Sequence, residues 1–162
     1  MEYAFLSGGM SGLSRADMSA WREYVGDMLK YDMYVFSPPD HYNEFNPEDY
    51  DSEREVRDYD VYKLRHAYIV IVYFNVPESI GTAQELAIAK EHGTPIIGIV
   101  PHCYAPDSSH PIHPWLQECC SKLFVDSRDT FNKTKVGGEW KVSPEWEAMM
   151  NYITYYYGGG AL

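Results

Sequence analysis

Hydrophobic residues alternate along the chain between short continuous runs and stripes with helical spacing. The continuous runs predict β-strands at residues 3–6, 33–36, 68–74, 95–100 and 123–125. Stripes that repeat every three or four residues predict one helix from Arg15 onward and others at residues 53–66, 83–91 and 144–157. The order is therefore strand and helix in turn, with a polar loop at residues 41–52 rich in Asn, Asp and Pro.

The run at residues 68–74 is apolar throughout and rich in β-branched side chains, so it needs cover on both faces and is predicted as a central parallel strand. The alternation predicts an α/β fold: a doubly wound, flavodoxin- or Rossmann-like parallel sheet of about five strands with helices on both faces. A length of 162 residues without an internal repeat predicts a single domain over residues 1–162. Such sheets bind ligands where their strands end, which draws attention to the loops starting at Ser7, Ser37, Asn75 and Pro101.

Charge and cysteine content narrow the partners. The formal net charge is −11, and no basic stripe follows any element, so a nucleic-acid polymer is not an expected partner. A single nucleotide stays open, because backbone N–H groups can hold one phosphate. The three cysteines predict no disulfide framework and fit a reducing, cytoplasmic location; no apolar run predicts a membrane span or a signal peptide.

The segment at residues 77–89 carries the most chemistry. It follows the central strand and opens a helix, with Gly81 allowing close backbone approach to a ligand. Glu85 is expected in the first helical turn, partly desolvated by apolar neighbours such as Leu86. The alternative is an ordinary first-turn glutamate stabilised by the helix dipole, and spacing alone does not decide between the two.

Three separated segments of the sequence resemble the nucleoside 2-deoxyribosyltransferase superfamily, including its nucleoside 5′-monophosphate N-hydrolase branch. They are residues 5–9 (Phe-Leu-Ser-Gly-Gly), residues 60–64 (Asp-Val-Tyr-Lys-Leu), and residues 79–89, where the pattern is S-x-G-T-x-x-E-L-x-x-A. Their order and spacing fit over roughly residues 3 to 100, and the last third matches only loosely. The third pattern is fairly specific, whereas the Ser-Gly-Gly loop alone is weak.

The resemblance implies two catalytic acids. Glu85 would attack the anomeric carbon C1′ and form a glycosyl ester that a second base or water then cleaves. Asp60 matches the family's second acid, which binds the base and helps to protonate it; a raised pKa would suit that role. The alternative for Asp60 is a solvated acid on a helix rich in acids.

Two departures from the transferase pattern favour water as the acceptor and a nucleoside 5′-monophosphate as the substrate. Phe5 replaces the tyrosine whose hydroxyl steadies the nucleophile in transferases, leaving more room for a 2′-OH. Ser79 replaces an aspartate that suits a free 5′-OH, and an uncharged serine can lie beside a phosphate. Each also has a plainer interpretation, Phe5 as a core residue and Ser79 as a turn residue.

The remaining candidate contacts follow from loop position and from the resemblance. Predicted substrate contacts besides Phe5, Ser79 and Gly81 are Ser7, Gly8, Gly9, Ser37, Asp40, His41, Ser108 and Ser109. The last two are candidates for phosphate contact in a neighbouring subunit, so the resemblance implies a homodimer or higher homo-oligomer. No cofactor and no metal are expected, because the His and Cys residues between positions 102 and 120 follow no zinc-binding spacing.

Three other functions stay open at the level of the sequence. A transferase would pass the sugar to another base, and a non-catalytic module on the same fold would bind a nucleotide without cleaving it. A flavodoxin-like redox domain would need a flavin and would leave Glu85 without a role.

Overall fold

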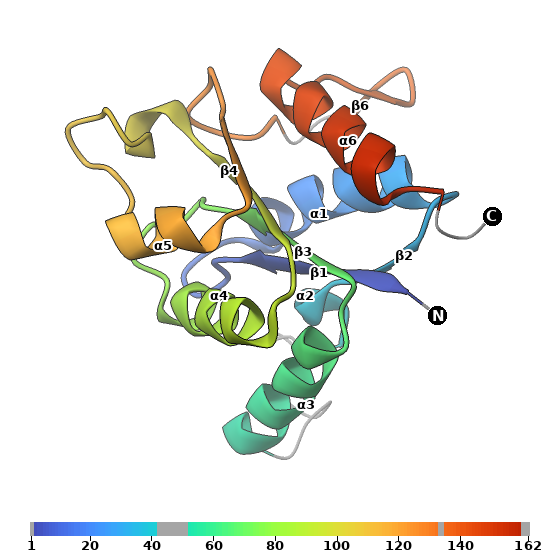
Figure 1. The fold of residues 1–162 in the computed structure, drawn as a ribbon. Helices are drawn as coiled ribbons and strands as arrows, with labels where there is room; N and C mark the ends of the chain where they lie inside the picture. Colours follow the sequence, from blue (N-terminus) through green and yellow to red (C-terminus); the bar gives the residue numbers. More distant parts are fainter. Residues whose placement is uncertain (1, 42–51, 133–134, 160–162) are drawn as a thin grey trace.

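A parallel five-stranded sheet forms the centre of the protein (Figure 1). The structure is a computed structural model, and it describes residues 2–41, 52–132 and 135–159. The strand order is β2-β1-β3-β4-β5, and every pairing is parallel, which confirms the predicted α/β fold. The strands are β1 (Tyr3–Gly8), β2 (Tyr34–Phe36), β3 (Ile69–Tyr73), β4 (Ile96–Val100) and β5 (Lys122–Val125).

Helices cover both faces of this sheet, as Figure 1 shows. On one face lie α1 (Arg15–Leu29) and α6 (Pro144–Tyr157), packed on a core cluster that includes Trp21, Trp146 and Ile71. On the other face lie α3 (Glu53–Arg65), α4 (Ile80–His92) and α5 (Pro114–Cys119), whose core cluster includes Leu64 and Leu86. The strands β3 and β4 are buried along their whole length, as continuous apolar runs predict.

Several short elements, α5 among them, lie outside the sequence-based prediction. The helix α2 (Pro38–His41) and the 3₁₀ turn η2 (His102–Tyr104) follow directly after strands. The strands β6 (Lys135–Val136) and β7 (Glu139–Trp140) form an antiparallel hairpin. Its turn residues Gly137 and Gly138 have φ values of 60° and 80°, a backbone conformation that glycine adopts without steric cost. Most of the polar loop predicted at residues 41–52 lies outside the described residues.

The start of α4 corrects the predicted position of Glu85. The helix begins at Ile80 instead of Ala83, because the Ser79 hydroxyl accepts the backbone N–H of Thr82 as an N-cap. Glu85 therefore lies in the second turn, and no acidic residue occupies the first. The interpretation of Glu85 as a first-turn, dipole-stabilised glutamate is wrong. Among the described residues, no helix is both long and apolar enough to cross a membrane.

Candidate active site

The candidate site lies where the strand order changes direction, between β1 and β3. Connections lead away from these neighbouring strands to opposite faces of the sheet, and ligands bind in the crevice that this arrangement opens. Ser7 is paired with Val72 near the carboxyl end of both strands. The helix α4 follows β3 across this edge and brings Glu85 to the end of β1.

Glu85 and Ser7 are joined by a hydrogen bond. The Ser7 hydroxyl donates to the Glu85 carboxyl oxygen Oε1 at 3.2 Å. Ser7 is fully buried, while Glu85 keeps a partly exposed side chain. A fixed donor of this kind holds the carboxyl group in one orientation and favours its ionised form.

The two glycines after Ser7 are required by close packing. A Cβ atom on Gly8 would lie 2.8 Å from a ring carbon of Trp21, and one on Gly9 would lie 2.5 Å from a Val76 side-chain carbon. The Gly9 N–H already donates to the side-chain oxygen of Asn75 at 2.9 Å. This amide is therefore used by the protein itself, so the structure gives no support to Gly9 as a phosphate ligand.

Asp60 and Glu85 line the same cavity, which has a volume of about 210 Å³. Asp60 comes from α3 and Glu85 from α4, and these two helices pack against each other. Gly8 and Gly81, two of the predicted substrate contacts, also line the cavity. The Asp60 oxygen Oδ1 is buried, and no described residue hydrogen-bonds to it. A buried polar atom without a partner is costly, and it is satisfied when a bound ligand supplies the missing group.

Burial raises the pKa of both acids. Loss of solvent raises the pKa of Glu85 to about 8; the charge of Asp60 acts in the same direction, while Arg22 and the Ser7 hydroxyl act against it. Loss of solvent likewise raises the pKa of Asp60 to about 6, against the charge of Arg22. Two acids that titrate this far above their ordinary range share one proton near neutral pH. Such a pair can act as acid and nucleophile in one reaction.

Arg22 is a cavity residue that the sequence analysis missed. Its side chain is 4% exposed and lines the cavity together with both acids. On α1 it lies on the buried stripe with Met18, Trp21 and Val25. A charged residue in register with a buried apolar stripe is a signal that the sequence does contain.

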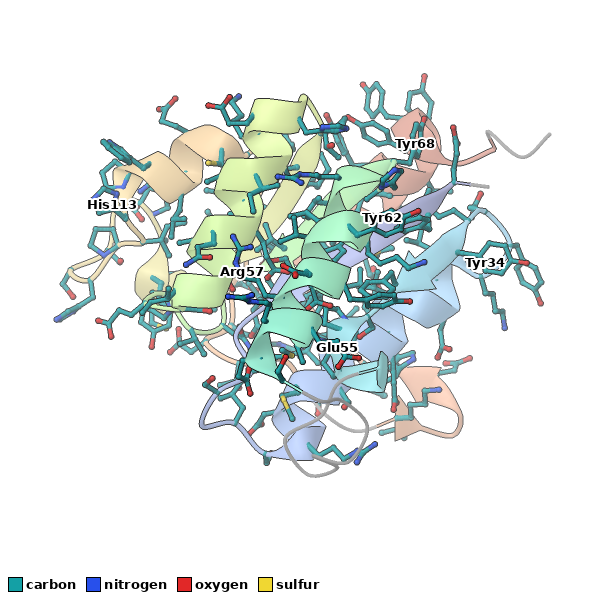
Figure 2. The ribbon with its side chains drawn as sticks, turned by 90° about the horizontal axis from the view of Figure 1, so that it is seen from below. Tyr34, Glu55, Arg57, Tyr62, Tyr68 and His113 are labelled. Atoms are coloured by element: carbon teal, nitrogen blue, oxygen red, sulfur yellow. The ribbon has the colours of Figure 1, made fainter. Side chains whose placement is uncertain are left out.

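Two charged residues on α3 also line the cavity and were not predicted. These are Glu53 and Arg57, which lie on the same helix as Asp60. Figure 2 shows Arg57 on the side of α3 that faces α4. The structure thus gives the cavity charged groups of both signs around its two acids.

Several predicted contact residues lie elsewhere. Phe5 has no exposed surface and stacks on Phe36 with ring centroids 5.3 Å apart, so its core interpretation is the one the structure supports. Ser37 is buried and lines a neighbouring cavity that shares Arg22 with the first. The Ser79 hydroxyl accepts hydrogen bonds from the N–H and the hydroxyl of Thr82, so its first role is to cap α4.

Ser108 and Ser109 do not line this cavity. Ser108 donates to the carbonyl of Ala105, and Ser109 contacts His110, both in the loop after β4. Their predicted role concerns a neighbouring subunit and stays a prediction. Asp40 and His41 fall in α2, and their side chains lie outside the description.

No metal centre emerges from the described ranges, in which no three His, Cys, Asp or Glu side chains gather closely enough to hold an ion. A wider hollow of about 720 Å³ follows β5 and is lined by His102 and by residues 127–132. It holds none of the predicted site residues. The chemistry therefore concentrates in the smaller cavity between α3 and α4.

Comparison with known proteins places the chain by its fold. No model of a protein family matches the sequence, and no curated protein matches it either. Among solved structures, it is similar to the 2-deoxyribosyltransferase of the psychrotolerant bacterium Bacillus psychrosaccharolyticus, with a TM-score of 0.56 and 18% identity over 76% of this chain and 86% of that one. A 2-desoxiribosyltransferase from Leishmania mexicana gives 0.56 and 16%, covering 97% and 99%.

A conserved protein from Enterococcus faecalis is also similar, with a TM-score of 0.60 and 12% identity over 78% of this chain and 92% of that one. At these identities the likeness concerns the fold. The predicted resemblance to 2-deoxyribosyltransferases is confirmed at that level: this chain has the fold of those enzymes.

Proposed function

We propose that the protein cleaves the N-glycosidic bond of a nucleoside or a nucleoside 5′-monophosphate. The observation that carries the proposal is the cavity in which Glu85 and Asp60 meet, with the Ser7 hydroxyl bound to Glu85. Structures of similar fold are named as 2-deoxyribosyltransferases, enzymes of nucleoside chemistry, which supports the same class of substrate. A cavity of both acidic and cationic groups suits a small polar ligand.

The reaction begins at the anomeric carbon. An oxygen of Glu85 attacks C1′, the C1′–N bond breaks, and its electron pair leaves with the base. Asp60 gives its proton to the departing base, which is the role of a general acid. Burial raises the pKa of both acids, so one proton is available to the pair near neutral pH. A base nitrogen that approaches the buried Asp60 oxygen favours this proton on Asp60 and leaves Glu85 free to attack.

The second step returns the enzyme to its starting state. In hydrolysis, water attacks C1′, the bond between C1′ and Glu85 breaks, and the water proton goes to Asp60. We favour water over a second base because the sequence lacks the transferase tyrosine at Phe5 and the transferase aspartate at Ser79. A transferase differs only in this step, with the nitrogen of an incoming base replacing water.

The test measures base release from a panel of nucleosides and 5′-monophosphates by chromatography, with and without an added acceptor base. We expect release without acceptor, and we expect Glu85→Ala to lower it by about a thousandfold or more, as loss of a nucleophile does. Release that depends on acceptor base would assign the transferase reaction instead. Binding without turnover of any substrate would leave a nucleotide-binding module and overturn the proposal.

The control for this experiment is Glu91→Ala. Glu91 is an exposed glutamate on the same helix as Glu85 and lies outside the cavity. Its replacement should leave base release unchanged, so a loss specific to Glu85→Ala cannot be ascribed to the removal of an acid from α4.

A further inference from the structure

A single buried arginine connects the elements of the candidate site. Arg22 is 4% exposed. Among the described residues, Arg22 and Asp126 are the two charged side chains that are buried. Burying a guanidinium group is costly unless its donors are bonded and its charge is compensated. The candidate site meets both conditions. Arg22 donates to the backbone at the end of β1, and it lines the same cavity as the two acids.

The guanidinium group binds the backbone on both sides of Ser7. Nη1 donates to the carbonyl of Leu6 at 2.7 Å, and Nη2 donates to the carbonyl of Gly8 at 3.3 Å. Ser7, between these carbonyls, donates its hydroxyl to Glu85. The planar fork of an arginine suits two acceptors at such spacing, whereas a lysine offers a single point of charge. Arg22 therefore fixes the piece of backbone that orients the nucleophile.

The guanidinium group also packs against the ring of Trp21. Its central carbon lies 4.6 Å from the ring centroid of Trp21, which is itself buried. Gly8 packs directly against the same two side chains, so a larger residue there would displace them. The cation consequently has little freedom to leave the cavity, and its charge acts at a constant place.

The charge acts on both acids. Arg22 lowers the pKa of Glu85 and of Asp60, against the rise that burial causes in each. The other polar and charged side chains that line the cavity around Glu85 are Glu53, Arg57 and Asp60 from α3 and Gln84 from α4. Ser7 on β1 donates a hydrogen bond to Glu85. Arg57 is exposed to solvent, so its charge is screened far more than that of Arg22.

We propose that Arg22 is the positioning residue of this site, which holds the Ser7 segment against Glu85 and supplies the permanent positive charge that lets a partly buried pair of acids carry one negative charge. The proposal rests on the proposed function for its catalytic meaning. It deepens that function in both steps, since the same charge favours the Glu85 carboxylate before attack and again when the glycosyl ester is cleaved.

The test is the pH dependence of kcat/KM in neutral variants of Arg22. The active form carries one proton on the pair, so the parent enzyme should show a bell-shaped profile. In Arg22→Met and Arg22→Gln the whole bell-shaped profile should move to higher pH by about one pH unit or more, because an opposite charge within a few ångströms of the acids is lost. Arg65→Met, an exposed arginine on the same helix as Asp60 that lines neither cavity, should leave the profile in place.

A lysine variant separates the two parts of the role. Arg22→Lys keeps the charge and loses the fork, so the bell should stay near its parental position while kcat falls by about tenfold or more. A purely structural arginine would give lower yield or stability with an unmoved bell in every folded variant. A bell that coincides with the parental one in Arg22→Gln would overturn the proposal.

A measurement without turnover keeps this proposal distinct from the proposed function. The ionisation of Glu85 can be followed by carboxyl ¹³C NMR in the ligand-free protein, with Glu85→Gln assigning the signal. We expect the midpoint of the Glu85 titration, and so its pKa, to lie about one pH unit or more higher in Arg22→Gln than in the parent. An unchanged value would refute the electrostatic role of Arg22 even if the enzyme is active, and a raised value would support it even if no substrate were cleaved.

Discussion

At the scale of single residues, the site depends on a balance between desolvation and one cation. Glu85 is held partly buried, near an acid that disfavours its charge and an arginine that favours it. An ordinary surface glutamate has neither neighbour, and its pKa is about 4.3. The pKa of Glu85 near 8 means that the folded protein holds a proton that the unfolded chain releases.

This retained proton makes stability depend on pH in a defined direction. Because the pKa of Glu85 is raised on folding, its favourable contribution is complete below pH 4.5 and is lost as pH rises through about 8. Glu85→Gln cannot ionise, so at pH 9 the variant should be more stable than the parent by about 2 kcal/mol or more. Near pH 4.5 the two should agree closely.

Urea unfolding at both pH values measures this difference. Glu91→Gln, an exposed glutamate on the same helix, is the matched control and should show no comparable gain at pH 9. An equal gain from Glu85→Gln at both pH values would indicate better packing of the amide instead of a relieved charge.

At the scale of the elements, α4 shows how a cap determines which face of a helix meets the cavity. The Ser79 cap starts the helix at Ile80, about one turn before the Ala83 that the apolar pattern predicts. This helix places Gly81, Gln84 and Glu85 along the cavity. The helix ends at His92, one residue beyond the predicted bound, and Gly93 caps it with a φ of 81°. The apolar pattern fixes the existence of the helix, but its first residue depends on a side-chain hydrogen bond that spacing does not reveal.

Ser79 offers a test of the substrate at this element. Ser79→Ala should cost about 1 kcal/mol of stability by removing the cap. Ser79→Asp keeps a good cap, so its stability should match the parent, but its negative charge should raise KM for 5′-monophosphates while leaving nucleosides almost unaffected. Steady-state kinetics on matched pairs of substrates measures this. Equal changes in KM for both would contradict a phosphate near this residue.

Two other elements differ in how far the sequence reveals them. The hairpin of β6 and β7 has a Gly-Gly turn between two short segments that favour β-strands. This pattern is typical of a hairpin, and the sequence analysis did not use it. The helix α5 is six residues long and begins at Pro114, and such a short helix leaves no periodic stripe to find. Arg22 was missed for another reason, because a polar residue beside apolar ones is ordinarily assigned to the solvent face of a helix.

At the scale of the whole molecule, α6 joins the end of the chain to the sheet through a buried polar contact. The Trp146 Nε1–H group donates to the Asp126 carboxylate at 3.0 Å, and Asp126 is 1% exposed. This contact ties the loop after β5 to the helix that covers β4 and β5. The alternation of apolar runs and stripes predicted the parallel sheet of about five strands and its two helical layers, but it did not predict the strand order β2-β1-β3-β4-β5.

The contact predicts a large effect on stability far from the cavity. Trp146→Phe leaves the buried Asp126 without this donor, which should cost about 1–3 kcal/mol. Trp140→Phe is a matched control, since Asp27 accepts from Trp140 but is half-exposed and also bound to Lys135, so its loss should cost less. Urea unfolding of both variants measures the difference. Comparable losses in the two would show that ring packing outweighs the buried hydrogen bond.

The hydrogen bond between Ser7 and Glu85 has a consequence for how the protein acquires activity. It joins residues 78 positions apart in the chain, and the guanidinium of Arg22 must also be seated before the pair is aligned. Contacts this distant form late, because the loop between them must close before they are gained. Regain of the proposed activity after dilution from denaturant should therefore trail the regain of helical signal, and the proposed catalytic residues would serve as a natural reporter of the last stage of folding.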